Sequence, residues 1–285
     1  MPVREAPDRR GRSLRGRAGL LERDDLLQAI SAALDGVENG AGQALLLEGH
    51  AGMGKTRLHE AALDEARNRG LRVLRAAGAE LEQNVALGVA GQLVRALLGD
   101  LTPAGRRAFL AEAPERVRSL AGTRADILDP GDAVEGTTSH RLFTLMAGAA
   151  EARPTLLAID DLHWCDVASL EFALYVLHRL DELPVALVMT RRPTAGGEAA
   201  DALDRIASHP RVRLEGLTGL GIDAVEELAR EALGDRAEPT VVEASIEVTG
   251  GNPFYVHELL VALAAERGST EPRSRAAPAH SPPTP

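Results

Sequence analysis

The chain has 285 residues, of which 45% are hydrophobic and 26% charged, a composition that suits a globular fold with a sizeable core and no stabilising disulfide or metal. Acidic residues outnumber basic ones by 42 to 32, and the net charge of −10 should repel the phosphates of nucleic acids and anionic lipids. Aromatic residues make up 2% of the chain, too few for a surface on which bases stack. We therefore expect no direct contact with nucleic acid.

The sequence contains no signal for export, membrane insertion or zinc binding. No uncharged apolar run approaches the roughly 18 residues that span a bilayer, and no apolar leader follows the first residues. Cys165 is the only cysteine, which excludes an intrachain disulfide, and no Cys or His pair has the spacing of a zinc site. These observations predict a cytoplasmic location without membrane contact.

Both ends of the chain differ in composition from the middle. Residues 1–18 are rich in Arg and lack periodicity, and residues 267–285 are rich in Pro, Ser, Ala and Arg. Such segments bury too little apolar surface to fold. We predict a disordered arm at residues 1–18 and a disordered tail at residues 267–285.

Between these ends the hydrophobic pattern predicts an α/β core at residues 19–216. Apolar residues recur at helical spacing from Glu22 to Val37. Five short apolar runs follow, and each is succeeded by a turn signal. They predict parallel strands, buried on both faces and alternating with helices. The runs are residues 44–48, 71–76, 155–160, 185–190 and 212–214.

Two further helical regions accompany this core. Residues 82–152 have a mostly helical pattern, which predicts a helical insertion between the second and third strands. After Gly216 the strand signals end, and helical patterns cover residues 222–233, 240–248 and 254–265. We predict a small helical subdomain at residues 217–266.

The first strand runs into residues 49–56, GHAGMGKT, which match the phosphate-loop pattern G-x-x-x-x-G-K-[ST] (Walker A) at every fixed position. In such a loop backbone N–H groups surround phosphate oxygens, Lys55 reaches the β and γ phosphates, and Thr56 offers a hydroxyl to Mg²⁺. Lys55 is the only lysine in the chain. A dinucleotide fingerprint would need a glycine where Arg57 stands. The alternative to a phosphate loop is a glycine-rich turn before an ordinary helix.

Asp160 and Asp161 end the third apolar run, where the carboxyl ends of parallel strands meet beside the phosphate loop. There Asp160 would hold Mg²⁺ through water, as a Walker B acid does, and Asp161 would orient or polarise the attacking water. Capping of the next turn is the alternative role for these acids.

The fourth run ends at Thr190, and Arg191 and Arg192 follow it directly. Cationic groups at this edge of the sheet would contact the γ phosphate and report its loss, and we favour Arg192 over Arg191 for that role. Solvated loop arginines are the alternative.

Four motifs in order resemble the N-terminal ATPase region of large LuxR-type transcriptional regulators, which are STAND signalling NTPases of the AAA-related P-loop group. The motifs are GHAGMGKT, LLAIDDLHWCD, VMTRRP and TGGNPFYVHELL, and LLERDDLL upstream also matches. The resemblance covers about residues 19–265. It implies a P-loop NTPase fold with the strand order 5-1-4-3-2.

The resemblance also assigns roles to individual residues. It implies that Mg²⁺ is held at Thr56 and Asp160, and that the catalytic groups are Asp161, Lys55 and Arg192. The G-x-P element of a closing helical subdomain would correspond to residues 251–253, and Glu22-Arg23 would flank the adenine. The nucleotide-binding residues would be Gly49, His50, Ala51, Gly52, Met53, Gly54, Lys55, Thr56, Arg57, Asp160, Thr190 and Pro253.

The residues after the acid pair have simpler interpretations. We expect Trp164 to pack the loop, His163 to be a hydrogen-bonded structural histidine, and Asp166 to cap the following helix. Nothing in the sequence marks Cys165 as reactive. None of Trp164, His163 and Asp166 is predicted to be catalytic.

The sequence thus predicts a signalling NTPase that binds Mg·ATP and hydrolyses it slowly to ADP and phosphate, as a conformational switch acting through a protein partner or self-association. Slow turnover is expected because Asp161 is one methylene shorter than the Glu of fast ATPases. We expect no DNA-reading helix in this chain, unlike in full-length regulators of this kind. Two alternatives remain: a nucleotide-responsive adaptor without significant hydrolysis, and a small-molecule phosphotransferase.

Overall fold

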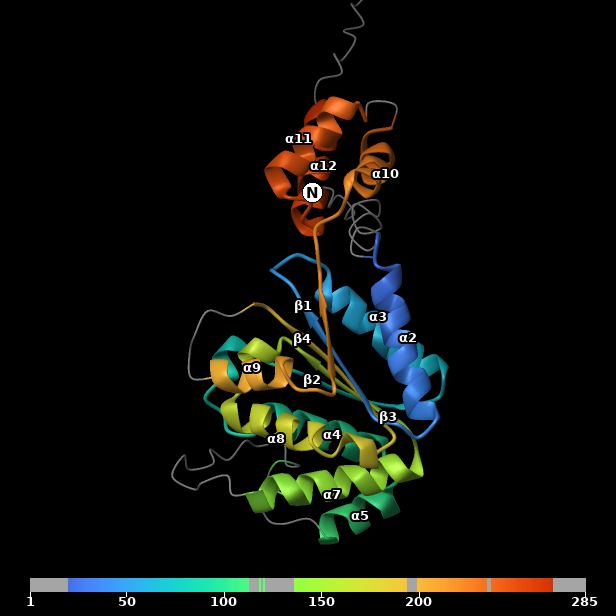
Figure 1. The fold of residues 1–285 in the computed structure, drawn as a ribbon, viewed down its shortest axis with the longest axis vertical. Coiled ribbons are helices and arrows are strands. Elements are labelled where there is room, and N and C mark those ends of the chain that lie inside the picture. The colour runs from blue at the N-terminus through green and yellow to red at the C-terminus, as the bar shows by residue number, and fades with distance from the viewer. Residues whose placement is uncertain are drawn as a thin grey trace, which may run out of the picture.

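The computed structural model describes residues 20–112, 118, 120, 136–193, 199–234 and 237–268. Over these residues a sheet lies between two layers of helices, and three further helices stand beyond the carboxyl ends of its strands (Figure 1). The predicted arm at residues 1–18 and most of the predicted tail, from residue 269 onward, lie outside the described residues.

The sheet has five parallel strands in the order β2-β3-β4-β1-β5, which confirms the predicted order 5-1-4-3-2. The predicted strands differ from the observed ones by at most two residues at any end, and the third run is matched at both ends. The strands are β1 (Gln43–Glu48), β2 (Arg72–Ala77), β3 (Thr155–Asp160), β4 (Val185–Arg191) and β5 (Val212–Gly216).

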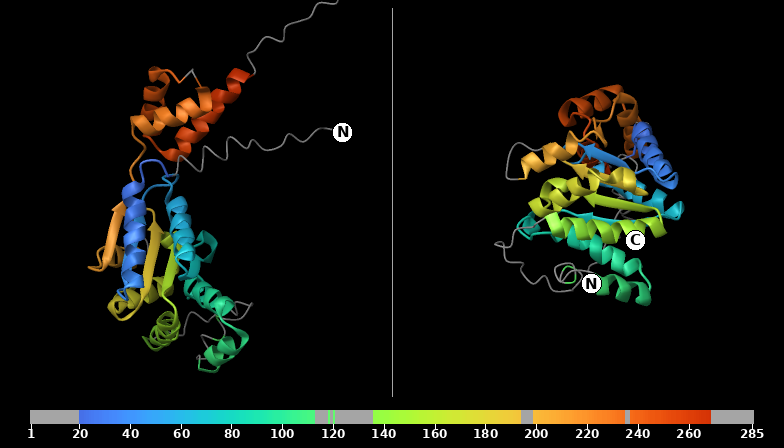
Figure 2. Two further views of the ribbon diagram at one scale, coloured as in Figure 1. Left: turned by 90° about the vertical axis from the view of Figure 1, so that its right-hand side faces the viewer. Right: turned by 60° about the horizontal axis from the view of Figure 1, so that its bottom comes forward.

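The described helices fall into three groups. One face of the sheet is covered by α2 (Asp24–Glu38) and α3 (Lys55–Asn68). The other is covered by α4 (Gly88–Asp100), α8 (Val167–Leu177) and α9 (Ala200–Ala207), with α5 (Pro103–Glu112) and α7 (Gly136–Ala152) outside them (Figures 1 and 2). The last group is α10 (Ile222–Leu233), α11 (Pro239–Thr249) and α12 (Pro253–Gly268). Short 3₁₀ helices span Glu80–Glu82, Leu162–Trp164 and Leu180–Glu182.

The continuous apolar runs form central strands because alternate side chains enter two separate cores. Leu45 and Leu47 of β1 pack with α2 and α3, whereas Leu46 packs with the helices of the opposite layer. Every residue of β3 and β4 is buried. A strand covered on both faces needs apolar residues at odd and even positions alike.

The expectation that all five strands are buried on both faces is wrong for β5. This strand pairs only with β1 and forms an edge of the sheet, and Leu214 is 44% exposed. Its chain continues directly into the last three helices, and the first residue after it, Leu217, donates its N–H to the carbonyl oxygen of Glu48 at 2.7 Å.

The segment between β2 and β3 contributes directly to the core. Within it, α4 lies on β2 and buries Leu93, Val94 and Leu97, so it forms part of the helical layer, while α7 packs against α8. The described residues of this segment add no strand to the sheet.

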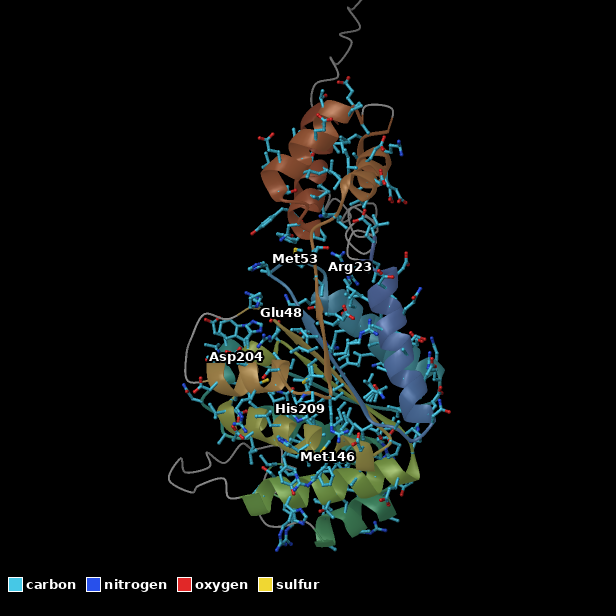
Figure 3. The ribbon with its side chains drawn as sticks, in the orientation of Figure 1. Arg23, Glu48, Met53, Met146, Asp204 and His209 are labelled. Atoms are coloured by element: carbon cyan, nitrogen blue, oxygen red, sulfur yellow. The ribbon has the colours of Figure 1, made fainter. Side chains whose placement is uncertain are left out.

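The last three helices, residues 217–268, form what we call the C-terminal helical unit. They have a small core of their own that includes Val225, Leu228, Val242 and Val256. Arg23 lies at the junction of this unit with the rest of the chain (Figure 3). None of the described helices combines the length and the apolar character needed to cross a lipid bilayer.

Gly78, the residue after β2, provides a test of this packing. An added Cβ would lie 2.4 Å from the carbonyl oxygen of Asp161 and 2.8 Å from the carbonyl carbon of Trp164. Because both neighbours are backbone, we expect Gly78→Ala to lower the free energy of unfolding by about 1–3 kcal/mol, measured by urea denaturation. The control is Gly148→Ala in α7, where an added Cβ meets nothing within 4 Å, and this change should be neutral or stabilising. Equal stability of Gly78→Ala and wild type would contradict the close approach.

Candidate nucleotide-binding site

The loop between β1 and α3 is shaped by glycines. Gly52 and Gly54 have φ angles of 81° and 93°, in the left-handed region that glycine enters without strain. Gly54 is also the N-cap residue of α3, and no side chain caps this helix. The N–H groups of the first helical turn therefore lie at the loop with the positive end of the helix dipole, an arrangement suited to binding an anion.

Lys55 holds this loop together through its side chain. The Lys55 ammonium donates to the carbonyl oxygens of Gly49 at 2.8 Å and His50 at 2.9 Å, and the residue is 6% exposed. Burial lowers the pKa of Lys55, and Arg192 lowers it further, while Asp161 and Asp160 oppose the change. The ammonium is thus positioned between the loop carbonyls and two carboxylates.

The acid pair at the end of β3 is fixed by Thr190 of β4. The Thr190 hydroxyl donates to Asp160 Oδ1 at 2.5 Å and accepts from the N–H of Asp161 at 2.9 Å. Asp160 is buried, whereas Asp161 lines a cavity. One hydroxyl thereby joins the ends of two neighbouring strands.

Asp161 has an unusual backbone conformation and environment. Its φ angle is 52°, a left-handed value that Asp and Asn adopt more readily than other residues with a Cβ. Burial raises the pKa of Asp161, and so does Asp160, while Lys55 and Arg192 act in the opposite direction. A carboxylate with a raised pKa is a stronger base.

The two arginines after Thr190 have different environments. Arg191 is buried, and its guanidinium donates to Glu48 Oε2 through Nε at 2.6 Å and to the carbonyl oxygen of Leu203 at 3.0 Å. Arg192 instead lines the cavity, and its Nε is buried without a hydrogen-bond partner among the described residues. Of the two guanidinium groups, that of Arg192 is therefore the one at the cavity.

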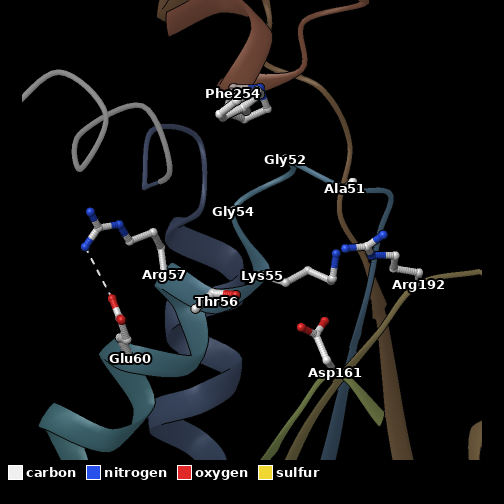
Figure 4. A pocket seen from close by; sticks show the side chains of 11 residues that line it. Ala51, Gly52, Gly54, Lys55, Thr56, Arg57, Glu60, Asp161, Arg192 and Phe254 are labelled. Carbon is white, nitrogen blue, oxygen red and sulfur yellow. Dashed lines mark hydrogen bonds and ion pairs between the residues drawn. The ribbon is translucent and has the colours of Figure 1, made fainter. Parts of the chain in front are cut away.

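These groups surround a cavity of about 530 Å³. The side chains of Lys55 and Arg192 point toward one another across it, and Asp161 faces both (Figure 4). The lining comes from the loop, α3, the ends of β3 and β4, and α12. The lining residues are Ala51, Gly52, Gly54, Lys55, Thr56, Arg57, Glu60, Asp161, Arg192, Pro253 and Phe254.

Some predicted site residues do not line this cavity, and two lining residues were not predicted. Predicted residues outside the lining are Gly49, His50, Met53, Asp160 and Thr190, although Asp160 and Thr190 lie directly behind Asp161. Glu60 and Phe254 were missed. Glu60 lies one turn after Thr56, so the helical period alone places both on one face. Phe254 directly follows the predicted residue Pro253, and no motif in the sequence around it indicates that its side chain lines the cavity.

The C-terminal helical unit contacts the loop through the start of α12. Asn252 donates from Nδ2 to the carbonyl oxygen of Ala51 at 2.8 Å, and the N–H of Phe254 donates to the carbonyl oxygen of Gly52 at 3.3 Å. The other end of the Asn252 amide, Oδ1, accepts from the N–H of Phe254 at 3.1 Å and so caps α12. One side chain thus both caps a helix and holds the loop.

Glu22 and Arg23, the predicted adenine-flanking segment, lie beside the connection between β5 and α10. A Glu22 carboxylate oxygen accepts from the N–H of Gly221 at 2.7 Å, and Arg23 Nη2 donates to the carbonyl oxygen of Thr218 at 2.7 Å. Neither residue lines the cavity. They fasten the start of α2 to the linker that leads into the C-terminal helical unit.

The residues after the acid pair have structural partners. Asp166 caps α8 by accepting from the N–H of Ser169 at 2.9 Å, which confirms the predicted cap. Cys165 is buried, and burial raises the pKa of its thiol, as Asp166 and Asp161 also do. A thiol that remains protonated is a poor nucleophile.

A glycine-rich loop between the first strand and a helix, in a parallel sheet of this strand order, defines a P-loop NTPase fold. Residues 19–189 match the family model described as an AAA ATPase domain, and the chain belongs to this family. A curated relative, the uncharacterised protein R02095 of Rhizobium meliloti (strain 1021), is 26% identical over 269 residues. The match covers 86% of this chain and 25% of the relative, so the chain spans about a quarter of that protein's length.

Solved structures of other proteins have a similar fold. Cdc6p from Pyrobaculum aerophilum superposes with a TM-score of 0.52 at 14% identity, over 87% of this chain and 63% of Cdc6p. A Signal Transduction ATPase with Numerous Domains (STAND) protein with a tetratricopeptide repeat sensor, from Pyrococcus horikoshii, superposes with a TM-score of 0.43 at 18% identity, over 83% of this chain and 32% of that one. The similarity to Cdc6p concerns the fold alone.

The contact between Asn252 and the loop can be tested by hydrogen exchange. Asn252→Asp keeps the oxygen that caps α12 but replaces the donor to Ala51 with a second carboxylate oxygen. Since a hydrogen bond contributes about 1 kcal/mol, we expect amide exchange in residues 49–54 to become about five-fold faster, measured by mass spectrometry. The control is Asn39→Asp, because Asn39 Nδ2 donates to the carbonyl oxygen of Asp35 within α2 and crosses no interface. Unchanged exchange in both variants would show that Asn252 does not hold the loop.

Proposed function

We propose that this chain is a nucleotide switch that binds Mg·ATP in the cavity between the phosphate loop and α12 and hydrolyses it slowly. The observation that carries the proposal is the meeting of Lys55, Asp161 and Arg192, from three separate elements, around one cavity at the loop (Figure 4). At this position the two cations can bind a polyanion, and the carboxylate can act on a water molecule that attacks it.

The phosphates would be held by the loop and by two cations. The Lys55 ammonium now donates to the neutral carbonyl oxygens of Gly49 and His50. Phosphate oxygens would replace these acceptors, because hydrogen bonds between two charged groups are stronger. The unpartnered Nε of Arg192 supports a role in binding the terminal phosphate.

The residues at the loop also suit Mg²⁺. Thr56 and Asp160 offer oxygen atoms, the ligands that Mg²⁺ prefers, and Mg²⁺ binds through one or two protein groups together with phosphates and water. Among the described residues no group of three or more His, Cys, Asp or Glu side chains could hold a metal without such help. When bound, the metal would neutralise charge on the phosphates.

Asp161 would orient and polarise the water that attacks the γ phosphate, giving ADP and phosphate. The raised pKa of Asp161 favours its action as a base. Its backbone is left-handed, a conformation that Asp adopts more readily than most residues with a Cβ. The short side chain limits contact with water and favours slow turnover.

The C-terminal helical unit would act as a lid, because α12 contributes Pro253 and Phe254 to the cavity and contacts Ala51 and Gly52 of the loop. We propose that its position reports the nucleotide state to a protein partner or a second copy of the chain in the cytoplasm. The net charge of −10 argues against nucleic acid as the direct partner. The four motifs support kinship with LuxR-type regulators of the STAND group.

The first test is nucleotide binding by Lys55→Ala. Because hydrogen bonds to charged groups contribute about 1.5–3 kcal/mol, we expect the affinity for Mg·ATP to fall by about 10- to 100-fold, measured by isothermal titration calorimetry. Arg67→Ala is the matched control, since Arg67 lies on the same helix in a solvent-exposed pair with Asp64. Unchanged affinity in Lys55→Ala would remove the proposal.

The second test is single-turnover hydrolysis by Asp161→Asn. Asn tolerates the same left-handed backbone, so the loss of charge is isolated, and we expect phosphate release to slow by about 10²- to 10⁴-fold while ATP affinity is retained. Asp64→Asn, at an exposed site on α3, should behave as wild type. If wild type at saturating ATP releases phosphate no faster than buffer does, the chain is a nucleotide-responsive adaptor. Stable phosphorylation of an added metabolite would indicate a phosphotransferase.

A further inference from the structure

His163 lies between the acid pair and Arg192, and the proposed chemistry assigns it no role. It lies in the 3₁₀ helix Leu162–Trp164, two residues after Asp161, and its side chain is 4% exposed. The main-chain N–H of Arg192 donates to His163 Nδ1 at 3.4 Å. Among the described residues, the buried Nε2 of His163 has no hydrogen-bond partner.

The imidazole of His163 is neutral near pH 7. Burial lowers the pKa of His163 to about 4, and Arg192 and Lys55 contribute, while Asp160 opposes them. Because Nδ1 accepts a hydrogen bond, the single ring proton is on Nε2. The 3.9 Å separation between Nδ1 and Asp161 Oδ1 is therefore not an ion pair at neutral pH.

This acceptor lies at the last peptide group of β4, whose carbonyl oxygen, on Arg191, accepts from the N–H of Gly49 at 3.2 Å. Arg191 is the last residue of β4, and its side chain is held by Glu48. Arg192 follows it outside the strand, and the hydrogen bond from its N–H is the one to His163. The direction in which the Arg192 side chain leaves the backbone thus depends on the imidazole as well as on the pairing of β4 with the end of β1.

We propose that His163 is a positioning residue that holds the backbone of Arg192 so that its guanidinium faces the terminal phosphate. The inference rests on the proposed function. Thr190 already joins β3 to β4 through Asp160 and Asp161, so loss of the His163 acceptor should leave the strands paired and disturb Arg192 alone. Loss of this acceptor should therefore change how well the site distinguishes a nucleoside triphosphate from a diphosphate.

Two substitutions whose side chains both branch at Cγ separate the acceptor from the packing. His163→Asn keeps an oxygen near the position of Nδ1, whereas His163→Leu fills a similar volume without an acceptor. Leu also removes the unpartnered Nε2 proton, so the thermal stability of this variant should be retained. A packing role alone would make both variants lose stability together.

The experiment compares the affinity for a non-hydrolysable ATP analogue with that for ADP, both with Mg²⁺. We expect Arg192→Ala and His163→Leu to lose preference for the triphosphate by a similar factor of about 10 or more, with ADP affinity unchanged. His163→Asn should retain the preference. The double variant His163→Leu, Arg192→Ala should be no worse than Arg192→Ala, since both changes remove one interaction.

Three results would overturn the inference: a wild-type preference in His163→Leu, an equal loss in the Asn and Leu variants, or additive losses in the double variant. Unchanged preference in Arg192→Ala would overturn it as well, because Arg192 would not contact the terminal phosphate. If His163→Leu fails to fold, His163→Gln replaces it, since the Gln amide reaches toward Nε2 and leaves Nδ1 without a substitute. Lys55→Ala is measured in parallel, and unchanged affinity of this variant for the ATP analogue would reject nucleotide binding at the loop, and with it the proposed function itself.

Discussion

The parallel register of the sheet is the constraint on which the site depends. Ala77 of β2 pairs with Asp160 of β3, and Glu48 of β1 pairs with Arg191 of β4, so the residues that follow these strands emerge at one edge. In a parallel sheet buried on both faces, the main-chain ladder fixes this alignment without help from the site residues. A phosphate loop, two carboxylates and an arginine therefore meet although they are far apart in sequence.

Charge balance is the second organising feature. Lys55 and Arg192 face Asp161, with Asp160 behind it, in a partly buried space where interactions between charges are stronger than in water. Burial lowers the pKa of Lys55 and raises that of Asp161, so each group is destabilised in its charged form by burial and stabilised by its opposite. An arriving polyanion would draw the two cations to itself, and Asp161 would then lose part of the attraction that opposes its raised pKa.

Local patterns predicted the strands, the glycine-rich loop and the cap at Asp166, since each depends on residues close in sequence. The contacts that complete the site could not be predicted in this way. Arg191 meets Glu48 across 143 positions, and Asn252 meets Ala51 across 201. The exposure of β5 was missed because its short apolar run looks the same at a sheet edge as in the interior. The assignment of Arg192 to nucleotide binding remains a prediction.

The position of β5 couples the last three helices to the loop between β1 and α3. This strand is both an edge of the sheet and the covalent link to the last three helices, and the N–H of the residue that follows it, Leu217, donates to the carbonyl oxygen of Glu48 immediately before the phosphate loop. Asn252 and Phe254 of the same helical unit also contact Ala51 and Gly52 of the loop. A displacement of the last three helices would thus reach the loop at two places, at Glu48 through Leu217 and at Ala51 and Gly52 through the start of α12.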